Sequence, residues 1–134
     1  MSSTIGFYGG VGSVTGANFM LDTGKLAVLV DCGLEQGDKF AKEINAKPFA
    51  YDPSKIDALF VTHAHADHIG RIPKLVKDGF RGVIHSTEPT KDLAAIVLPQ
   101  PAGPVIKMFL PLTAERIRYF HFNSFIIKPC GFRE

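Results

Sequence analysis

The stretch VTHAHADHIG, residues 61–70, concentrates four side chains of the kinds that bind divalent metals. His63, His65, Asp67 and His68 lie within six consecutive positions, directly after the apolar run IDALFVT. His63 and His65, two apart in an extended segment, can point their rings to the same side and share one metal ion. Asp67 and His68, in the turn that follows, can face a second ion about 3.5–4 Å away. The spacing predicts a two-metal hydrolytic site rather than an accidental polar loop.

The chain on either side of this stretch reads as strands alternating with helices. Five segments are predicted as strands (residues 4–10, 17–24, 25–33, 56–62 and 81–87) and two as helices (71–79 and 88–98). Both helices have proline in the first turn, where the missing N–H costs nothing, and Thr87 can cap the second. The metal-type residues fall in a loop between a buried strand and helix 71–79. A hairpin followed by strand–helix alternation predicts a mixed α/β sheet with helices on at least one face.

The sequence also predicts two connecting segments and one strand in the interior of the sheet. Residues 9–18, GGVGSVTGAN, contain four glycines and are predicted to form a loop. Residues 34–55 are polar and contain two prolines, as in a connecting excursion. The run LAVLV, residues 26–30, is apolar on both faces, which predicts a strand inside the sheet with cover on both sides.

Composition describes an ordinary globular protein of one domain. The 134 residues are 46% hydrophobic and 21% charged, and the net charge of +2 is too small to indicate nucleic-acid binding by itself. The N-terminus shows no signal-peptide pattern, and no apolar run approaches the roughly 20 residues of a membrane span. Cys32 and Cys130 are far apart, so free thiols are expected rather than a disulfide. We therefore expect a cytoplasmic protein without a membrane partner.

The character of the sequence changes after Leu98. Residues 99–134 hold five of the nine prolines and five of the eleven phenylalanines, and they carry a net charge of +3 against −1 for residues 1–98. We predict two parts: residues 1–98 belong to the folded domain, and residues 99–134 form an atypical basic, Pro/Phe-rich tail. Within the tail, residues 113–119 favour a short helix.

Three successive motifs carry a family resemblance. They are GGVGSVTGANFML, LVDCGLEQG and YDPSKIDALFVTHAHADHIGRIPKLVKDGFRGVIHSTEPTKDL, and the match covers residues 4–98. H-x-H-x-D-H after an apolar strand is the hallmark of the metallo-β-lactamase fold, and with these neighbours the chain resembles the β-CASP branch of RNA-processing nucleases. The resemblance implies an incomplete fold, the N-terminal half of an αββα sandwich, with residues 1–98 as the N-terminal part of a metallo-β-lactamase domain.

The resemblance also implies a function and a set of site residues. It implies a zinc-dependent hydrolase that cleaves RNA phosphodiesters with a hydroxide bridging two Zn²⁺ ions, and RNA as its partner. His63 and His65 would bind the first zinc, and Asp67 and His68 the second, with Asp67 as the candidate catalytic residue. Asp31, at the end of LVD, would orient the metal loop through hydrogen bonds; the alternative is an ordinary strand-end aspartate. Substrate-binding residues stay unknown.

The family's later metal-binding motifs are not recognisable in this sequence. Relatives carry a further His, a metal-bridging Asp and another His downstream, and four residues cannot complete two zinc coordination spheres. The chain alone is therefore expected to show little or no turnover, as a truncated or frameshifted fragment that at most binds metal weakly. Completion by a homo-oligomer or a complementing chain is another route. A thioesterase- or glyoxalase-type hydrolase on the same fold is a further alternative.

Several weaker candidates favour structural roles. His121 lacks the glycine-rich context of a third metal-binding motif, and His85 lies in a strand, where packing is the simpler explanation. Ser13 and Thr15 in the glycine-rich loop either face the substrate or stabilise a turn. A basic run follows the metal-type residues and reads mainly as a solvated surface, with RNA contact as the alternative; it comprises Arg71, Lys74, Lys77 and Arg81.

Overall fold

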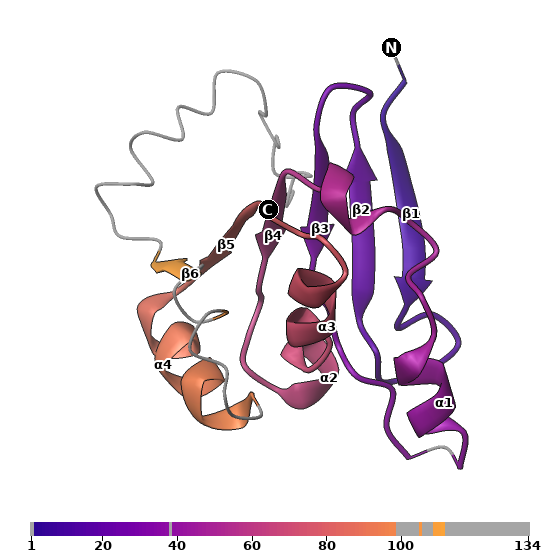
Figure 1. Ribbon diagram of the computed structural model, residues 1–134, viewed down its shortest axis with the longest axis vertical. Coiled ribbons are helices and arrows are strands. Elements are labelled where there is room, and N and C mark those ends of the chain that lie inside the picture. The colour runs from indigo at the N-terminus through magenta and orange to yellow at the C-terminus, as the bar shows by residue number, and fades with distance from the viewer. Residues whose placement is uncertain (1, 38, 99–104, 106–108, 112–134) are drawn as a thin grey trace, which may run out of the picture.

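The computed structural model describes residues 2–37, 39–98, 105 and 109–111 (Figure 1). Its centre is a six-stranded sheet whose strand order follows the chain. The strands are β1 (Thr4–Gly9), β2 (Asn18–Asp22), β3 (Ala27–Val30), β4 (Ala58–Phe60), β5 (Val83–Ser86) and β6 (Phe109–Pro111). β2 pairs antiparallel with both β1 and β3, and β3 to β6 are parallel. The predicted mixed α/β sheet is therefore confirmed.

Helices connect the strands and cover one face of the sheet. They are α1 (Ala41–Ala46), the 3-10 turn η1 (Pro53–Lys55), α2 (Ala66–Ile69), α3 (Ile72–Lys77) and α4 (Glu88–Val97). In Figure 1, α2 and α3 lie in front of the centre of the sheet. The Thr87 side chain accepts from the Thr90 N–H, so the predicted cap of α4 is confirmed. No described helix has the length and apolar character needed to cross a membrane.

The connection predicted for residues 34–55 contains α1 as well as η1. The α1 segment AKEINA buries no residue and has no side-chain cap at its start. Neither an apolar stripe nor a capping pattern therefore marked it in the sequence.

The hydrophobic core lies between the sheet and the helices. Leu29, Leu59 and Ile84 are neighbours across β3, β4 and β5 and are fully buried. Burial of each such side chain stabilises the fold by about 1.5–3 kcal/mol. The same cluster contains residues from the helices and the segments after them: Ile69, Ile72, Leu75, Phe80, Ala94, Leu98 and Val105. Val105 and β6 thus contribute to the fold beyond residue 98, while the division into two parts stays a prediction.

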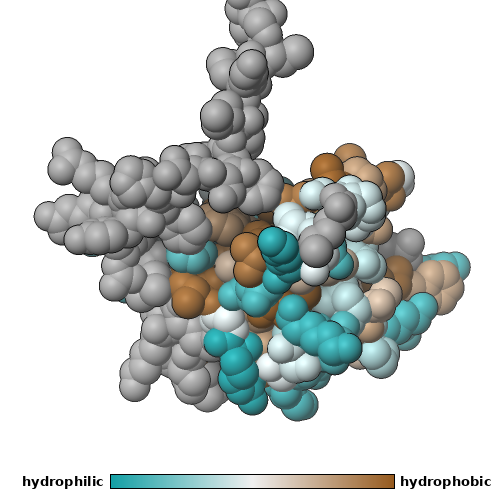
Figure 2. All heavy atoms as spheres, turned by 90° about the horizontal axis from the view of Figure 1, so that it is seen from above, coloured by the Kyte–Doolittle hydropathy of each residue, from teal (hydrophilic) through white to brown (hydrophobic). Residues whose placement is uncertain are grey.

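The opposite face of the sheet is also apolar. The strand register places Phe7, Phe19 and Val30 in one row across β1, β2 and β3. Ile5 and Phe7 are 64% and 63% exposed in the described structure. Viewed from above, hydrophilic side chains gather along one rim of the described surface, and hydrophobic ones lie in its centre and at the opposite rim (Figure 2). The expected cover on both faces of the sheet stays a prediction.

Candidate metal centre

The four metal-type residues lie at the edge where the parallel strands end. β4 ends at Phe60, and α2 begins at Ala66. The first turn of α2 is closed by the His68 N–H, which donates to the His65 carbonyl at 2.9 Å. Asp67 and His68 therefore lie on a one-turn helix, which corrects the expectation that all four residues occupy a loop. Ligand sites of open α/β sheets form at this carboxyl edge.

Backbone hydrogen bonds join three chain segments around this turn. The Cys32 N–H donates to the His68 carbonyl at 2.7 Å, and the Ala17 N–H donates to the Asp67 carbonyl at 2.9 Å. The Gly33 N–H donates to the Ala17 carbonyl at 2.9 Å. A Cβ at Gly33 would overlap the Asp67 carbonyl, so the segments can approach this closely only because residue 33 is glycine.

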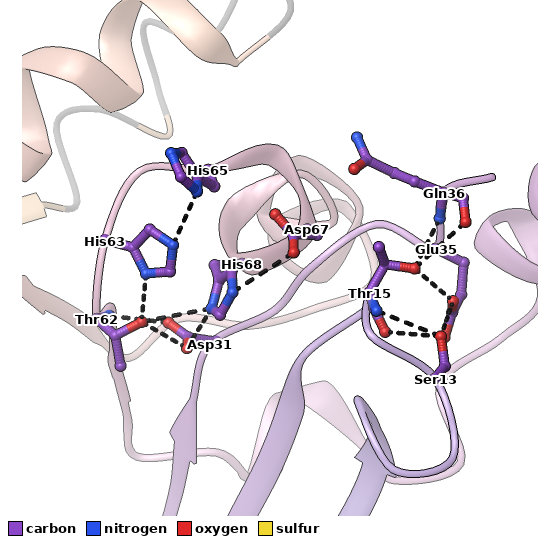
Figure 3. Close-up of polar contacts among 10 residues, drawn as sticks. All are labelled: Ser13, Thr15, Asp31, Glu35, Gln36, Thr62, His63, His65, Asp67 and His68. Atoms are coloured by element: carbon purple, nitrogen blue, oxygen red, sulfur yellow. Dashed lines mark hydrogen bonds and ion pairs between the residues drawn. The ribbon is translucent and has the colours of Figure 1, made fainter.

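Asp31 connects β3 to this turn and has an uncommon backbone conformation. It is buried, and its φ of +59° is the only positive value among the described non-glycine residues. That conformation costs an L-residue roughly 1–2 kcal/mol. Thr62 donates its N–H to Asp31 Oδ1 at 2.8 Å and its hydroxyl to Oδ2 at 2.7 Å. His68 Nδ1 lies 2.8 Å from the same Oδ2 (Figure 3). Asp31 thus holds both the segment after β4 and helix α2.

The Asp31 carboxylate also determines which ring nitrogens carry protons. An ionised carboxylate only accepts hydrogen bonds, so Thr62 Oγ1 and His68 Nδ1 both donate to it. Because the Thr62 hydroxyl proton is used in this way, Oγ1 accepts from His63 Nδ1, which is 3.0 Å away. When these two rings are neutral, this arrangement leaves the lone pair on Nε2 in His63 and in His68.

The metal-type side chains form two pairs of potential metal ligands, called the donor pairs below. His63 Nε2 and His65 Nδ1 are 3.1 Å apart, and His68 Nε2 and Asp67 Oδ2 are 3.6 Å apart (Figure 3). Ligands about 2.0–2.1 Å from one tetrahedral ion are separated by about 3.3–3.4 Å. Each pair thus has close to the spacing of two ligands on a single ion. The His68 and Asp67 atoms can also attract each other directly when His68 carries a proton, so this pair can form without a metal ion.

The two pairs are not complete coordination sets. Among the described residues, no group of three or more His, Cys, Asp or Glu side chains is placed to hold one metal ion. A structural zinc takes four protein ligands, and a catalytic zinc usually takes three. The residues fit metal binding in chemistry and spacing, with two potential ligands in each pair.

The glycine-rich loop lies beside these pairs and has an anchor of its own. Ser13 and Thr15 donate their hydroxyls to Glu35 Oε2 at 3.1 and 3.0 Å (Figure 3). The Gln36 N–H donates to Thr15 Oγ1 at 3.0 Å. Between the two hydroxyl residues, Val14 is 97% exposed. Ser13 and Thr15 make contacts that stabilise the turn, one of the two roles considered for them.

His85 does not join the donor pairs in the described structure. The His85 ring stacks on the Phe60 ring with centroids 4.8 Å apart, which fits the packing role expected of it. His121 and Cys130 lie outside the described residues, and so does the short helix expected at residues 113–119.

The basic run is largely engaged in contacts within the chain. The Arg71 guanidinium lies over the Phe49 ring at 4.2 Å from its centroid. Lys74 forms an ion pair with Asp78, four residues further along. Arg81 donates to the backbone carbonyls of Val76, in the last turn of α3, and of Phe80, which follows that helix. These contacts account for most of the run without an RNA partner.

Cys32 follows Asp31 and is fully buried with a free thiol. Burial raises the pKa of this thiol to about 12. The expectation of a free, core-type cysteine is therefore confirmed for Cys32.

The sequence analysis did not identify Thr62, which contacts the metal-type segment, or Glu35, which holds the glycine-rich loop. Thr62 had a usable signal, because a hydroxyl residue directly before H-x-H-x-D-H can reach the first histidine. Glu35 had none, because its partners Ser13 and Thr15 lie 20 or more positions away in the chain.

Known proteins resemble this chain in sequence. The sequence profile described as the metallo-beta-lactamase superfamily matches residues 12–104. Ribonuclease TTHA0252 of Thermus thermophilus is 45% identical over 91 residues, which are 68% of this chain and 21% of the ribonuclease. Transcription termination factor FttA of Methanocaldococcus jannaschii is 36% identical over 128 residues, 94% of this chain and 19% of the factor. The chain spans about a fifth of the length of these curated relatives.

A solved structure resembles the fold. A flavo di-iron protein from Thermotoga maritima superposes with a TM-score of 0.50 at 24% sequence identity, over 72% of this chain and 22% of that one. At this identity the likeness concerns the fold alone.

Proposed function

The chain belongs to the metallo-beta-lactamase superfamily, and on that basis we propose that it carries the metal-ligand loop of a zinc-dependent RNA nuclease of the β-CASP branch. The main support is the pair of donor sets that Asp31 organises at the carboxyl edge of the sheet. The ribonuclease relative at 45% identity favours RNA as the substrate.

In this proposal, His63 and His65 bind one zinc ion, and Asp67 and His68 bind the other. The lone pairs on Nε2 of His63 and His68 suit them as ligands, because a ligating imidazole must be unprotonated at the binding nitrogen. Bound zinc would supply Lewis acidity toward the phosphoryl oxygens and lower the pKa of water to near neutrality. Asp31 and Thr62 keep the rings of His63 and His68 in the tautomers and orientations that binding requires.

For the 134-residue chain by itself, we propose weak metal binding and slow turnover. Each donor pair supplies two of the three or four ligands that zinc sites use, and the free energy of binding falls with each ligand that water replaces. The alignment with the Methanocaldococcus factor covers 94% of the chain and so runs past residue 98, which weighs against a frameshifted tail. Completion by further protein ligands, from a second copy or another chain, would raise both affinity and turnover.

The proposed function can be tested with the purified chain and a labelled single-stranded RNA. Zinc affinity is measured by competition with a chromophoric chelator, and RNA cleavage is followed on gels with and without added zinc. Asp67→Asn should weaken zinc binding at least tenfold, because it removes a charged ligand. Any cleavage by the wild-type chain should require zinc and be lost in this variant.

Asp78→Asn is the matched control, since it makes the same chemical change at the end of α3. Asp78 pairs with Lys74 on the surface, and such pairs contribute only about 0–1 kcal/mol. The control should bind zinc and act on RNA as the wild type does. Equal zinc affinities in the wild type and Asp67→Asn, or cleavage that persists in excess chelator, would contradict the proposal.

A further inference from the structure

A chain of side-chain hydrogen bonds runs from the surface to Asp31. The Tyr51 hydroxyl donates to Asn18 Oδ1 at 3.0 Å. The Asn18 amide, which is buried, donates through Nδ2 to the Asp31 backbone carbonyl at 2.9 Å. Asp31 is the residue whose carboxylate holds Thr62 and His68. Two residues remote in sequence are thus linked to the metal-ligand loop.

The direction of every bond in this chain is determined. A backbone carbonyl only accepts, so the Asn18 atom that faces it must be the NH₂ group. Asn18 therefore presents its oxygen to Tyr51, and the Tyr51 hydroxyl must donate. Both polar ends of the buried amide are therefore satisfied, and removal of either partner would leave one of them without its protein hydrogen bond.

The bond to the Asp31 carbonyl falls where the backbone is under strain. Asp31 has a φ of +59°, and a residue in this region persists there only if its surroundings enforce it. The Asp31 N–H is fixed by the Phe60 carbonyl at 2.9 Å, and the Asp31 carbonyl is fixed by Asn18. With both ends held, the carboxylate is directed toward Thr62 and His68. Without Asn18, the peptide after Asp31 would be held only through the Cys32 N–H, which donates to the His68 carbonyl at 2.7 Å, and the Asp31 carboxylate would be directed less firmly.

Tyr51 is held rigidly enough to act as an anchor. Its ring packs edge-on against Tyr8 with centroids 4.8 Å apart, and against Phe49 at 5.2 Å. It also packs against the hydrophobic core. Burial raises the pKa of the Tyr51 phenol, so the hydroxyl keeps its proton and remains a donor throughout the neutral range.

We propose that Asn18 and Tyr51 are positioning residues for the metal-ligand loop: they lock the strained Asp31 backbone and thereby hold His68 in its metal-binding tautomer. This inference rests on the proposed metal-dependent function, although it concerns the chain's own geometry. Neither residue touches metal or substrate in this scheme.

The test compares Tyr51→Phe with the wild-type chain at 10 °C. Two quantities are measured: zinc affinity by chelator competition, and the tautomer of His68 from long-range ¹H–¹⁵N imidazole spectra of the metal-free protein. Loss of an outer hydrogen-bond partner of a ligand weakens metal binding 10–100-fold, and Tyr51 acts through two further residues, so a loss of about threefold to tenfold is expected. His68 should change from one tautomer to a mixture of two. Asn18→Ala should have the same effects, more strongly.

Tyr8→Phe is the matched control. It removes a phenol hydroxyl from the ring that contacts Tyr51 but leaves the bonds to Asn18 and Asp31 intact. It should keep wild-type zinc affinity and a single His68 tautomer, and thermal unfolding shows whether either variant loses stability in general. The inference is overturned if Tyr51→Phe retains both wild-type properties, or if Tyr8→Phe loses them equally. If even the wild type binds no zinc, the proposed function fails, and the His68 spectra alone still decide whether the positioning role is real.

Discussion

The segment that carries the metal-type residues and the glycine-rich loop lie side by side at one edge of the sheet, yet they are held in different ways (Figure 3). The first is joined to residues 17, 32 and 34 through backbone hydrogen bonds and to Asp31 through a buried carboxylate. The second is held by Glu35 through side-chain hydroxyls and leaves Val14 almost fully exposed. A ligand set must keep its geometry to within a fraction of an ångström, whereas a loop at the mouth of a site can tolerate movement.

The largest difference is expected when a methyl group is added at one glycine packed against the metal-type segment and at one glycine of the glycine-rich loop. Gly33→Ala should cost about 3 kcal/mol or more, a large fraction of the stability of an ordinary domain, because the new Cβ overlaps the backbone of Asp67. Urea unfolding followed by circular dichroism measures the loss.

Gly12→Ala is the matched change in the glycine-rich loop. Its Cβ meets nothing within 4 Å, so only the left-handed backbone, φ +72°, is penalised. We expect a cost of about 1 kcal/mol. Equal costs at the two positions would mean that the metal-ligand segment is no more tightly packed than the loop beside it.

Asp31→Asn tests the negative charge of the carboxylate that contacts Thr62 and His68. An amide has one oxygen for the donors from Thr62 and His68, and its NH₂ group would face one of them. Zinc affinity should fall by about 10–100-fold, because the His68 ring loses its fixed tautomer. Isothermal titration with zinc measures the change. An affinity within twofold of the wild type would show that Asp31 is an ordinary strand-end aspartate.

Glu35→Gln is the corresponding change in the glycine-rich loop. It weakens the charge-assisted bonds from Ser13 and Thr15 and should reduce stability by about 1 kcal/mol. Amide hydrogen exchange should accelerate in residues 11–16, with zinc affinity unchanged. A loss of zinc affinity as large as that of Asp31→Asn would show that the two regions act as one unit.

The smallest effect is expected from pH, through the Cys32 thiol. Its pKa is raised in the folded state, so the folded protein keeps the proton that the unfolded chain begins to lose near its ordinary value of 9.0. The free energy of unfolding should therefore be unaffected below about pH 8 and should fall as the pH rises above 9. Urea unfolding at pH 8 and pH 9.5 measures the fall, and Cys32→Ala should remove this part of it. A thiol that titrates normally would give the two proteins the same pH dependence.

Much of the fold was predictable because its signals are local. The hairpin between β2 and β3 follows from the turn residues at 22–25, and α4 follows from Thr87 and the proline after it. The helix α1 was not predictable, since it buries no side chain. The start of α2 at Ala66 was also missed, because a single turn has no periodic pattern of its own.

The candidate metal centre likewise has features with local sequence signals and features without them. By itself, the sequence determined which residues are chemically able to bind metal, because H-x-H-x-D-H is a local pattern whose spacing places the donors close together. Tertiary structure alone decided how those donors are oriented. Asp31 reaches Thr62 and His68 across 31 and 37 positions, and Asn18 and Tyr51 meet across 33. Hydrogen bonds between residues this far apart in the sequence form only when the folded chain brings them together. The buried Asp31 carboxylate can therefore orient the His68 ring in a way that no local sequence pattern encodes.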